Sequence, residues 1–271
     1  MTILIYMLAG ALAAILLAGL SYYANLDRKM GSLLTVLAVM IALFLTRTYG
    51  IPYYQAANFE SDIKKASPLF ALLAQKSPET FNRYVAAVKK DILNNQPQNI
   101  LYKTSDFVNA EVMKYAVYSS NQALYNQMKG TLDFYQHLFK INPKLVLISE
   151  FPERFTNEPE MDELVKASKS YIDRLLKAKE DIIISAITHP APALSRHEIL
   201  EAQALLGELF DALAAEYGSN NVETTFQNPQ SPSLDKTKGA EIIIQFYQRL
   251  VKRGERETGL VLRYIASASA R

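Results

Sequence analysis

Residues 3–23 read ILIYMLAGALAAILLAGLSYY and carry no charged side chain. A helix rises about 1.5 Å per residue, so these 21 residues match the roughly 30 Å thickness of a membrane's hydrocarbon layer. A cleaved signal peptide is the alternative, but it would begin with basic residues, and only Met1 and Thr2 precede the apolar run. We therefore predict a membrane-spanning helix over 3–23.

A second uncharged run follows at residues 30–46, and Arg47 can extend it to a span of 30–49 by turning its charge toward water. Neither run has a polar face, which argues against the alternative that both are core helices of a soluble protein. The two spans together predict a transmembrane helical hairpin within residues 1–51. Tyrosines at the ends of the hairpin fit the aromatic belt of a membrane boundary: Tyr22, Tyr23, Tyr49, Tyr53 and Tyr54.

Basic residues next to the spans predict the orientation. Arg28 and Lys29 lie in the turn between the spans, whereas only Arg47 lies near the far end. Cytoplasmic loops of membrane proteins are enriched in Lys and Arg, so the turn is expected to face the cytoplasm, with these three cations at the lipid headgroups. Residues 52–271 would then lie on the opposite side of the inner membrane, in the periplasm of a bacterium.

Small residues recur at intervals of four along one face of each span. They are Gly10, Ala14 and Ala18 in the first span, and Ala38 and Ala42 in the second. Small side chains allow helix backbones to approach closely within a membrane. The favoured interpretation is that the two faces pack against each other, and the alternative is that they dock against another membrane protein.

Helix start signals recur through residues 52–271. Ser67-Pro68 and Ser77-Pro78 each place a capping hydroxyl before a proline that can begin a helix. Ser195 and Glu198 have the spacing of a capping box. No segment shows the sustained alternation of a half-exposed strand, so the sequence predicts a mainly α protein, with an all-α domain of several helices after the hairpin.

Two stretches interrupt the predicted helices. Residues 149–160 contain two prolines and no apolar periodicity, so they read as a connection and a possible boundary between two helical halves. Residues 219–234 are polar, also contain two prolines, and are predicted to form a long loop that ends where Asp235 caps the closing helix. Residues 145–148 could form a short strand, although a helical turn is favoured.

The composition excludes several classes of function. Residues 52–271 carry 26 basic and 26 acidic side chains, because residues 1–51 hold only four charged ones. A domain that binds nucleic acid normally shows a basic excess, so no nucleic-acid partner is expected. The absence of cysteine excludes disulfides, thiolate metal sites, iron-sulfur clusters and cysteine nucleophiles.

His189, His197 and Glu201 are the best local candidates for a metal site. His197 and Glu201 are four residues apart and can share one helix face, with His189 in the preceding loop. The local sequence HEILE lacks the second histidine of the HExxH pattern, however, so a solvated helix start is the favoured interpretation. We predict no catalytic residue, no metal and no cofactor.

Two surfaces are candidates for interaction. Tyr115, Tyr118, Tyr125 and Tyr135 are interleaved with Asn and Gln, a composition typical of protein interfaces, although ordinary half-buried packing is favoured. The closing helix carries a basic face that could meet anionic lipid, although a solvated face with local ion pairs is favoured. That face comprises Arg249, Lys252, Arg253, Arg256 and Arg263.

Together these patterns predict a membrane-anchored helical interaction or scaffold component of a bacterial envelope assembly. Its expected partners are the membrane and other envelope proteins, or a second copy of the chain. The alternative is an envelope hydrolase with a divalent metal near His189, His197 and Glu201. An enzyme is the less favoured of the two, because no nucleophile or phosphate-loop motif accompanies these residues.

Overall fold

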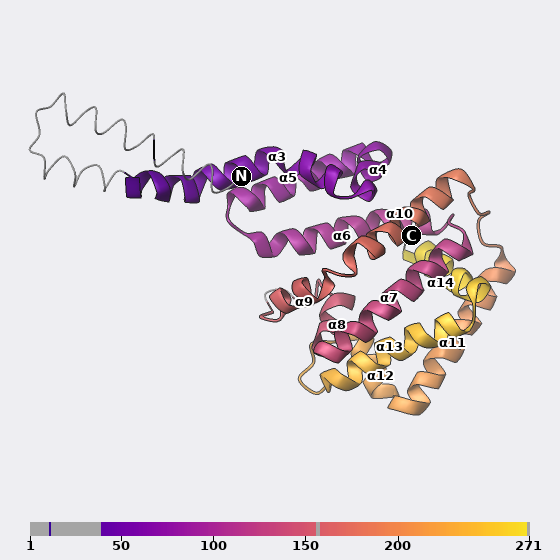
Figure 1. The fold of residues 1–271 in the computed structure, drawn as a ribbon. Helices are drawn as coiled ribbons and strands as arrows, with labels where there is room; N and C mark the ends of the chain where they lie inside the picture. The colour runs from indigo at the N-terminus through magenta and orange to yellow at the C-terminus, as the bar shows by residue number, and fades with distance from the viewer. Residues whose placement is uncertain (1–10, 12–38, 156–157, 270–271) are drawn as a thin grey trace, which may run out of the picture. The chain divides into compact units, whose positions relative to one another are not determined.

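The computed structural model describes residue 11, residues 39–155 and residues 158–269 (Figure 1). In this part of the chain it contains twelve α-helices, one π-helix and no strand, which confirms the predicted all-α class there. Apart from Ala11, residues 1–38 of the predicted hairpin lie outside the described residues. Within the described ranges, no helix is both long enough and apolar enough to cross a membrane.

The chain divides into two compact units, and each combines segments that are separate in the sequence. The smaller unit takes the described part of Met1–Ile63 together with Glu79–Leu101. The larger unit takes Lys64–Pro78 together with Tyr102–Arg271. The predicted boundary at residue 51 and the possible one at residues 149–160 stay predictions.

Helices α3 (Ile51–Ala66) and α5 (Pro78–Leu93) belong mainly to the smaller unit. The chain is helical from residue 39 and passes through a π-helix at Thr46–Gly50 directly into α3. Aromatic contacts join the two helices, since the ring of Tyr84 lies 6.1 Å from the ring of Phe59. Helix α5 begins at its proline as predicted, and its apolar stripe supplies the buried residues Phe81, Val85 and Val88.

The larger unit contains the remaining helices, and α6 crosses the division between the units. Helix α7 lies at its centre, in contact with α8, α9, α10, α13 and α14 (Figure 1). The bounds are α4 Pro68–Lys76, α6 Pro97–Ala116, α7 Asn121–Ile141, α8 Lys144–Glu150, α9 Met161–Ser168, α10 Ile172–Thr188, α11 Arg196–Tyr217, α12 Ser219–Gln227, α13 Lys236–Lys252 and α14 Glu255–Ser269.

Two buried clusters form the core of the larger unit. One joins α7, α8 and α13, and the other joins α11 with α12, α13 and α14. Helix α8 is short, and its four consecutive residues Leu145, Val146, Leu147 and Ile148 are all fully buried. Because α8 is covered on every side, it shows no amphipathic period, and the favoured helical turn at this position is confirmed.

The predicted caps form at Ser195 and Asp235. Ser67 lies at the N-cap position of α4, before Pro68, but its side chain makes no capping hydrogen bond. The Ser195 hydroxyl accepts a hydrogen bond from the Glu198 backbone N–H, and the Glu198 carboxylate accepts one from the Ser195 backbone N–H. Asp235 accepts hydrogen bonds from two backbone N–H groups at the start of α13. Gly218 ends α11 with a φ of 84°, a conformation that glycine adopts without strain.

The predicted long loop at residues 219–234 is wrong over its first half, which forms α12. Three residues in this polar segment explain the helix: Val222 is 6% exposed, Thr225 is fully buried, and the ring of Phe226 packs against α11 and α13. The free energy gained by burying one side of this helix outweighs the low helix propensity of its polar residues. Only residues 228–235 remain as a loop.

A short break separates α6 from α7. Helix α6 begins at Pro97 and ends at Ala116. The break that follows lies at residues 117–120, because the Ser120 hydroxyl caps α7 through the Ala123 backbone N–H at 3.2 Å. Gly130 lies in the middle of α7 and does not interrupt it.

The contact between α7 and α14 requires glycine at position 259. A Cβ atom there would lie 2.5 Å from the backbone Cα of Asn121. We expect Gly259→Ala to lower the free energy of unfolding by about 1–3 kcal/mol, because one helix must move. The control is Gly207→Ala on α11, where nothing lies within 4 Å, and it should raise stability by about 0.5–1 kcal/mol. Denaturant unfolding measures both changes in the free energy of unfolding. A Gly259→Ala variant that is as stable as the wild type would contradict the close contact.

Candidate functional site

The residues predicted to contact the membrane lie mostly outside the described part of the chain. Gly10, Ala14, Ala18, Ala38, Arg28 and Lys29 all fall there. Of the others, Ala42 is partly buried and Arg47 is exposed. The predictions for residues outside the described part of the chain stay predictions.

Large apolar side chains are exposed along the helical residues 39–54. Met40 and Phe44 are 64% and 65% exposed, and Tyr49 and Tyr53 are 66% and 71% exposed. Exposed single apolar residues are ordinary, but several within four helical turns form a surface that is poorly suited to water. This surface is the first candidate for interaction.

The four predicted interface tyrosines do not share one surface. Tyr118 is 48% exposed, whereas Tyr115 and Tyr125 are partly buried. Tyr135 is only 5% exposed and lies in the core with α8 and α13. Of the predicted set, Tyr118 is therefore the side chain best placed to contact a partner.

The backbone around Tyr118 is held by several hydrogen bonds from distant segments. The Tyr118 carbonyl accepts from the Ala191 backbone N–H at 2.8 Å, and the Ser119 and Ser185 hydroxyls lie 2.6 Å apart. The Ser185 hydroxyl also accepts from the Ser120 backbone N–H at 3.1 Å. The turn that carries Tyr118 is thus fixed before any partner binds, which lowers the entropy cost of binding.

Arg263 completes this support from inside the protein. Its side chain is 6% exposed, and its Nε donates to the Val117 carbonyl at 3.0 Å while an Nη atom donates to the Pro192 carbonyl. Burial lowers the pKa of Arg263, and the nearby Glu198 acts in the opposite direction. Arg263 therefore does not belong to an exposed basic face.

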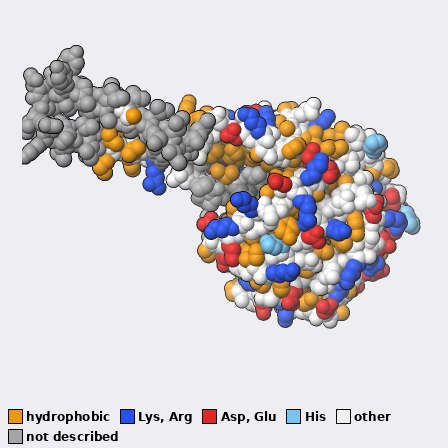
Figure 2. All heavy atoms as spheres, viewed as in Figure 1, with side chains coloured by type: hydrophobic (Ala, Val, Ile, Leu, Met, Phe, Trp, Pro, Cys, Tyr) orange, Lys and Arg blue, Asp and Glu red, His pale blue; other side chains and the backbone are white. Residues whose placement is uncertain are grey.

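Three other basic residues of the closing segment pair with glutamates of α11, which confirms the favoured interpretation of an ion-paired face. Two pairs are 2.7 Å long, and each is largely exposed, so each contributes little to stability. The larger unit shows acidic and basic side chains interspersed on the face in Figure 2. The pairs are Arg249 with Glu216, Arg253 with Glu208 and Arg256 with Glu201.

The candidate metal ligands have other contacts. Glu201 binds the guanidinium of Arg256, and His189 lies with its Nδ1 3.1 Å from the Thr188 hydroxyl. Glu198, next to His197, is engaged in the capping box. Among the described residues, no group of three or more His, Asp or Glu side chains is arranged to hold a metal ion.

A buried polar cluster that the sequence did not indicate lies between α7, α8 and α13. The Tyr135 hydroxyl donates to Glu150 Oε2 at 2.5 Å, and the Tyr247 hydroxyl donates to the same oxygen at 2.9 Å. The two rings meet edge to face with centroids 5.2 Å apart. No sequence signal could have found this cluster, because Tyr247 and Glu150 are 97 residues apart.

Burial controls the protonation of this cluster. It raises the pKa of Glu150, although the two tyrosine hydroxyls oppose the rise by binding the carboxylate. Burial also holds the pKa of Tyr135 and of Tyr247 well above the usual value, and the charge of Glu150 adds to the effect. Both tyrosines are therefore donors at neutral pH, and the cluster holds three helices together.

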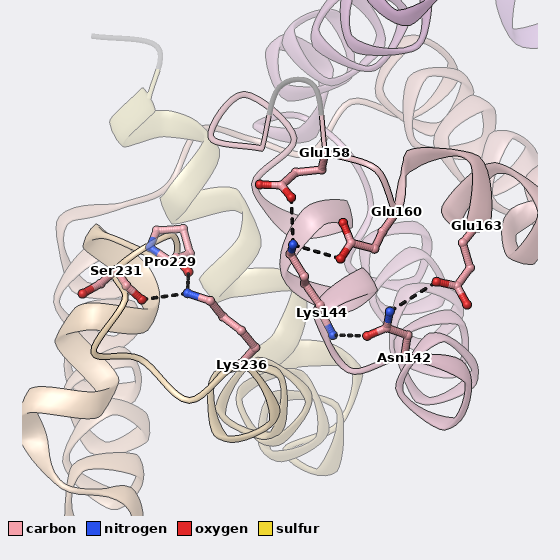
Figure 3. A network of polar contacts seen from close by, with 8 residues as sticks. All are labelled: Asn142, Lys144, Glu158, Glu160, Glu163, Pro229, Ser231 and Lys236. Atoms are coloured by element: carbon pink, nitrogen blue, oxygen red, sulfur yellow. Dashed lines mark hydrogen bonds and ion pairs between the residues drawn. The ribbon is translucent and has the colours of Figure 1, made fainter.

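A second polar network fixes the two connecting segments of the larger unit (Figure 3). The Lys144 ammonium donates to Glu158 at 2.7 Å and to Glu160 at 3.0 Å. The Lys236 ammonium donates to two backbone carbonyls of the 228–235 loop, those of Pro229 and Ser231. These bonds raise the pKa of Lys144 and lower that of Glu160, whereas burial lowers the pKa of Lys236. The network is structural, because its charges are engaged within the protein.

Lys179 is the basic group whose pKa is shifted furthest. Burial lowers its pKa to about 8, and its ammonium donates to the Asn109 side chain at 2.7 Å. Within the described residues it has no carboxylate partner, but it lines neither of the two hollows that follow.

Two hollows adjoin each other on α7. The larger, of about 480 Å³, lies between α7 and α13 beside the end of α11. The smaller, of about 270 Å³, lies between α7 and the start of α10. Gln136 and Lys140 line both hollows.

Comparison of the chain with known protein families, with curated protein sequences and with solved structures finds no match. The evidence for the candidate sites is therefore their geometry.

The Glu150 cluster predicts how stability depends on pH. The folded pKa of Glu150 is raised, so its contribution to stability is complete below the unfolded pKa and is lost as pH rises through the folded value. We expect Glu150→Gln to remove this dependence. The free energy of unfolding of the wild type should therefore rise relative to that of the variant as pH falls from neutral. Denaturant unfolding across this range measures the difference.

Two further variants complete this test. Glu150→Ala leaves two hydroxyls without their acceptor, so it should lower the free energy of unfolding by about 1–3 kcal/mol at any pH. Glu223→Gln, at an exposed position on α12, is the matched control and should leave the pH profile unchanged. Identical profiles for wild type and Glu150→Gln would show that this carboxyl does not titrate in the way its burial requires.

Proposed function

We propose that this chain is a membrane-anchored helical interaction or scaffold component of a bacterial envelope assembly. The anchor is the uncharged N-terminal sequence, and the basic residues Arg28 and Lys29 in the turn support a periplasmic side for residues 52–271. The observation that carries the proposal is the exposed apolar surface of residues 39–54, which continues the uncharged run 30–46 toward the helical domain.

The energetics of that surface favour a membrane. Burying one large apolar side chain is worth about 1.5–3 kcal/mol relative to water, and Met40, Ile41, Phe44 and Leu45 are each about half or more exposed. Tyr49 and Tyr53 follow one and two turns later, with rings that are suited to the boundary between lipid and water. A sequence that passes from aliphatic to tyrosine residues along one helix is typical of a segment leaving the bilayer.

The larger unit supports the interaction half of the proposal. Three arginines of its closing helices pair with glutamates of α11. Tyr118 is exposed on a turn that buried hydrogen bonds hold in place. A rigid, exposed tyrosine is a common anchor of protein interfaces.

The membrane anchor is tested by extraction. We expect the full-length chain to stay in the membrane pellet after washing with alkaline carbonate, because two spans bury far more apolar surface than a peripheral contact. Detergent should release it. A chain with residues 1–51 deleted is the matched comparison and should appear in the supernatant. Release of the full-length chain by carbonate alone would remove the anchor and the proposal with it.

The role of Tyr118 is tested by two tyrosine variants with opposite expected effects. Tyr118→Ser should abolish co-purification of partner proteins from solubilised membranes and leave the melting temperature nearly unchanged, since the side chain is exposed. Tyr135→Phe should retain the partners but lose about 1–2 kcal/mol of stability, because it removes a hydrogen bond to Glu150. Unchanged partners in Tyr118→Ser would exclude this turn as the interface.

A further inference from the structure

The smaller hollow on α7 is lined by polar side chains from two helices. Its volume is about 270 Å³, which is enough for a small group such as a phosphate with its bonded neighbours. The lining side chains can all donate or accept hydrogen bonds, and none is aliphatic. They are Asp133, Gln136, His137 and Lys140 from α7, with Tyr171 and Arg174 at the start of α10.

The ring of Tyr171 contacts two of the side chains that line this hollow, His137 and Arg174. The His137 ring stacks on it with centroids 4.9 Å apart and an interplanar angle of 29°. The guanidinium carbon of Arg174 lies 5.0 Å from the same ring centroid, and Phe134 packs against Tyr171 from the core at 5.5 Å. An arginine held over an aromatic ring loses less freedom when its N–H groups bind an anion.

The charges in the hollow are incompletely matched. The contact of Arg174 with Asp133 is 3.5 Å long, and both side chains are about half exposed, so the pair is loose. Lys140 makes no ion pair or hydrogen bond with the described residues, although it lines the same hollow. Two permanent cations thus face one carboxylate here, in contrast to the matched pairs between α11 and the closing helices.

The adjoining larger hollow offers room for the rest of a ligand. It shares Gln136 and Lys140 with the smaller one, and Phe139 and Ile244 give it an apolar side. A molecule with its anionic group at Lys140 and Arg174 could therefore extend a less polar part over Phe139. This arrangement suits an organic anion better than a simple ion.

We propose that the smaller hollow binds a phosphate group, carried either by a small organic phosphate or by a phospholipid headgroup. A phosphate presents several acceptor oxygens, and the hollow offers the guanidinium of Arg174, the ammonium of Lys140 and the side-chain amide of Gln136 as donors. The planar fork of an arginine fits two phosphate oxygens at once. The site does not rest on the membrane-anchored function proposed above.

Calorimetric titration of the full chain in a non-ionic detergent, with inorganic phosphate as the probe, tests the site. We expect saturable binding that Arg174→Gln and Lys140→Gln each weaken by about tenfold or more, since each removes a charged hydrogen bond. Asp133→Asn should strengthen binding, because it removes both a repulsive carboxylate and the competitor for Arg174. Arg174→Lys should fall between wild type and Arg174→Gln, because it keeps the charge and loses the fork.

The matched control is Lys177→Gln, one turn further along α10. Lys177 is as exposed as Arg174 and pairs with Glu180 and Asp181, so its removal changes the net charge equally without touching the hollow. It should leave phosphate affinity within about twofold of wild type. Melting temperatures of all variants show whether each still folds.

Three further probes distinguish the sources of the phosphate. Phenyl phosphate represents a soluble organic phosphate, dioctanoyl phosphatidic acid represents a lipid headgroup, and dioctanoyl phosphatidylcholine controls for the acyl chains. Tighter binding of phenyl phosphate than of phosphatidic acid identifies a soluble ligand, and the reverse order identifies a lipid, provided that Arg174→Gln weakens the binding. The proposal is overturned if neither phosphate binds, if Arg174→Gln and Lys177→Gln have equal effects, or if Asp133→Asn weakens binding.

Discussion

The packing of the larger unit depends on helix α8, which is buried on every side. Its own four consecutive apolar residues point to all sides of the helix, so α7, α13 and α9 can all pack against so short an element. Such a helix must also satisfy its polar end, because an unpaired charge in a low-dielectric core is costly. Glu150 ends α8, and it accepts hydrogen bonds from one tyrosine of α7 and one of α13. The hydrophobic contacts and the polar contacts therefore join the same three helices.

The same principle of pairing a buried charge with distant groups recurs at Arg263. Its guanidinium donates to the carbonyl of Val117, directly after α6, and to that of Pro192, in the loop after α10. Both carbonyls lie beyond the end of a helix, where the backbone lacks intrahelical donors. Among the described residues no carboxylate forms an ion pair with Arg263, so the stabilising interactions are its hydrogen bonds to peptide carbonyls. One buried side chain from α14 thus fixes both the turn before α7 and the loop after α10. This contact acts together with the hydrogen bonds of Ala191 and Ser185 to hold the turn that carries Tyr118.

Features that depend on neighbouring residues could be predicted from the sequence, and features that depend on distant ones could not. The Ser195–Glu198 capping box and the Asp235 cap involve groups two or three residues apart, so their sequence pattern determines their geometry. Helix α12 was missed because its stability comes from packing of Phe226 against α11 and α13. Tyr135 and Tyr118 look alike in sequence, yet one is core and the other exposed, since the helical period alone does not say which face meets α8 and α13. Neither the Glu150 cluster nor the hollow at Tyr171 has a local signature, because each joins segments at least fifteen residues apart.

The even balance of charge over residues 52–271 is not spread evenly in space. Between α11 and the closing helices, each of three arginines faces a glutamate, so that face has little attraction for an external ion. At the start of α10 the ring of Tyr171 holds Arg174 at a distance from Asp133 that makes a weak pair, and Lys140 lies nearby without an acidic partner among the described residues. Since a carboxylate that pairs fully would suppress anion binding, the loose contact is what leaves this hollow able to attract an anion. A neutral domain can in this way carry a local cationic site that its composition does not reveal.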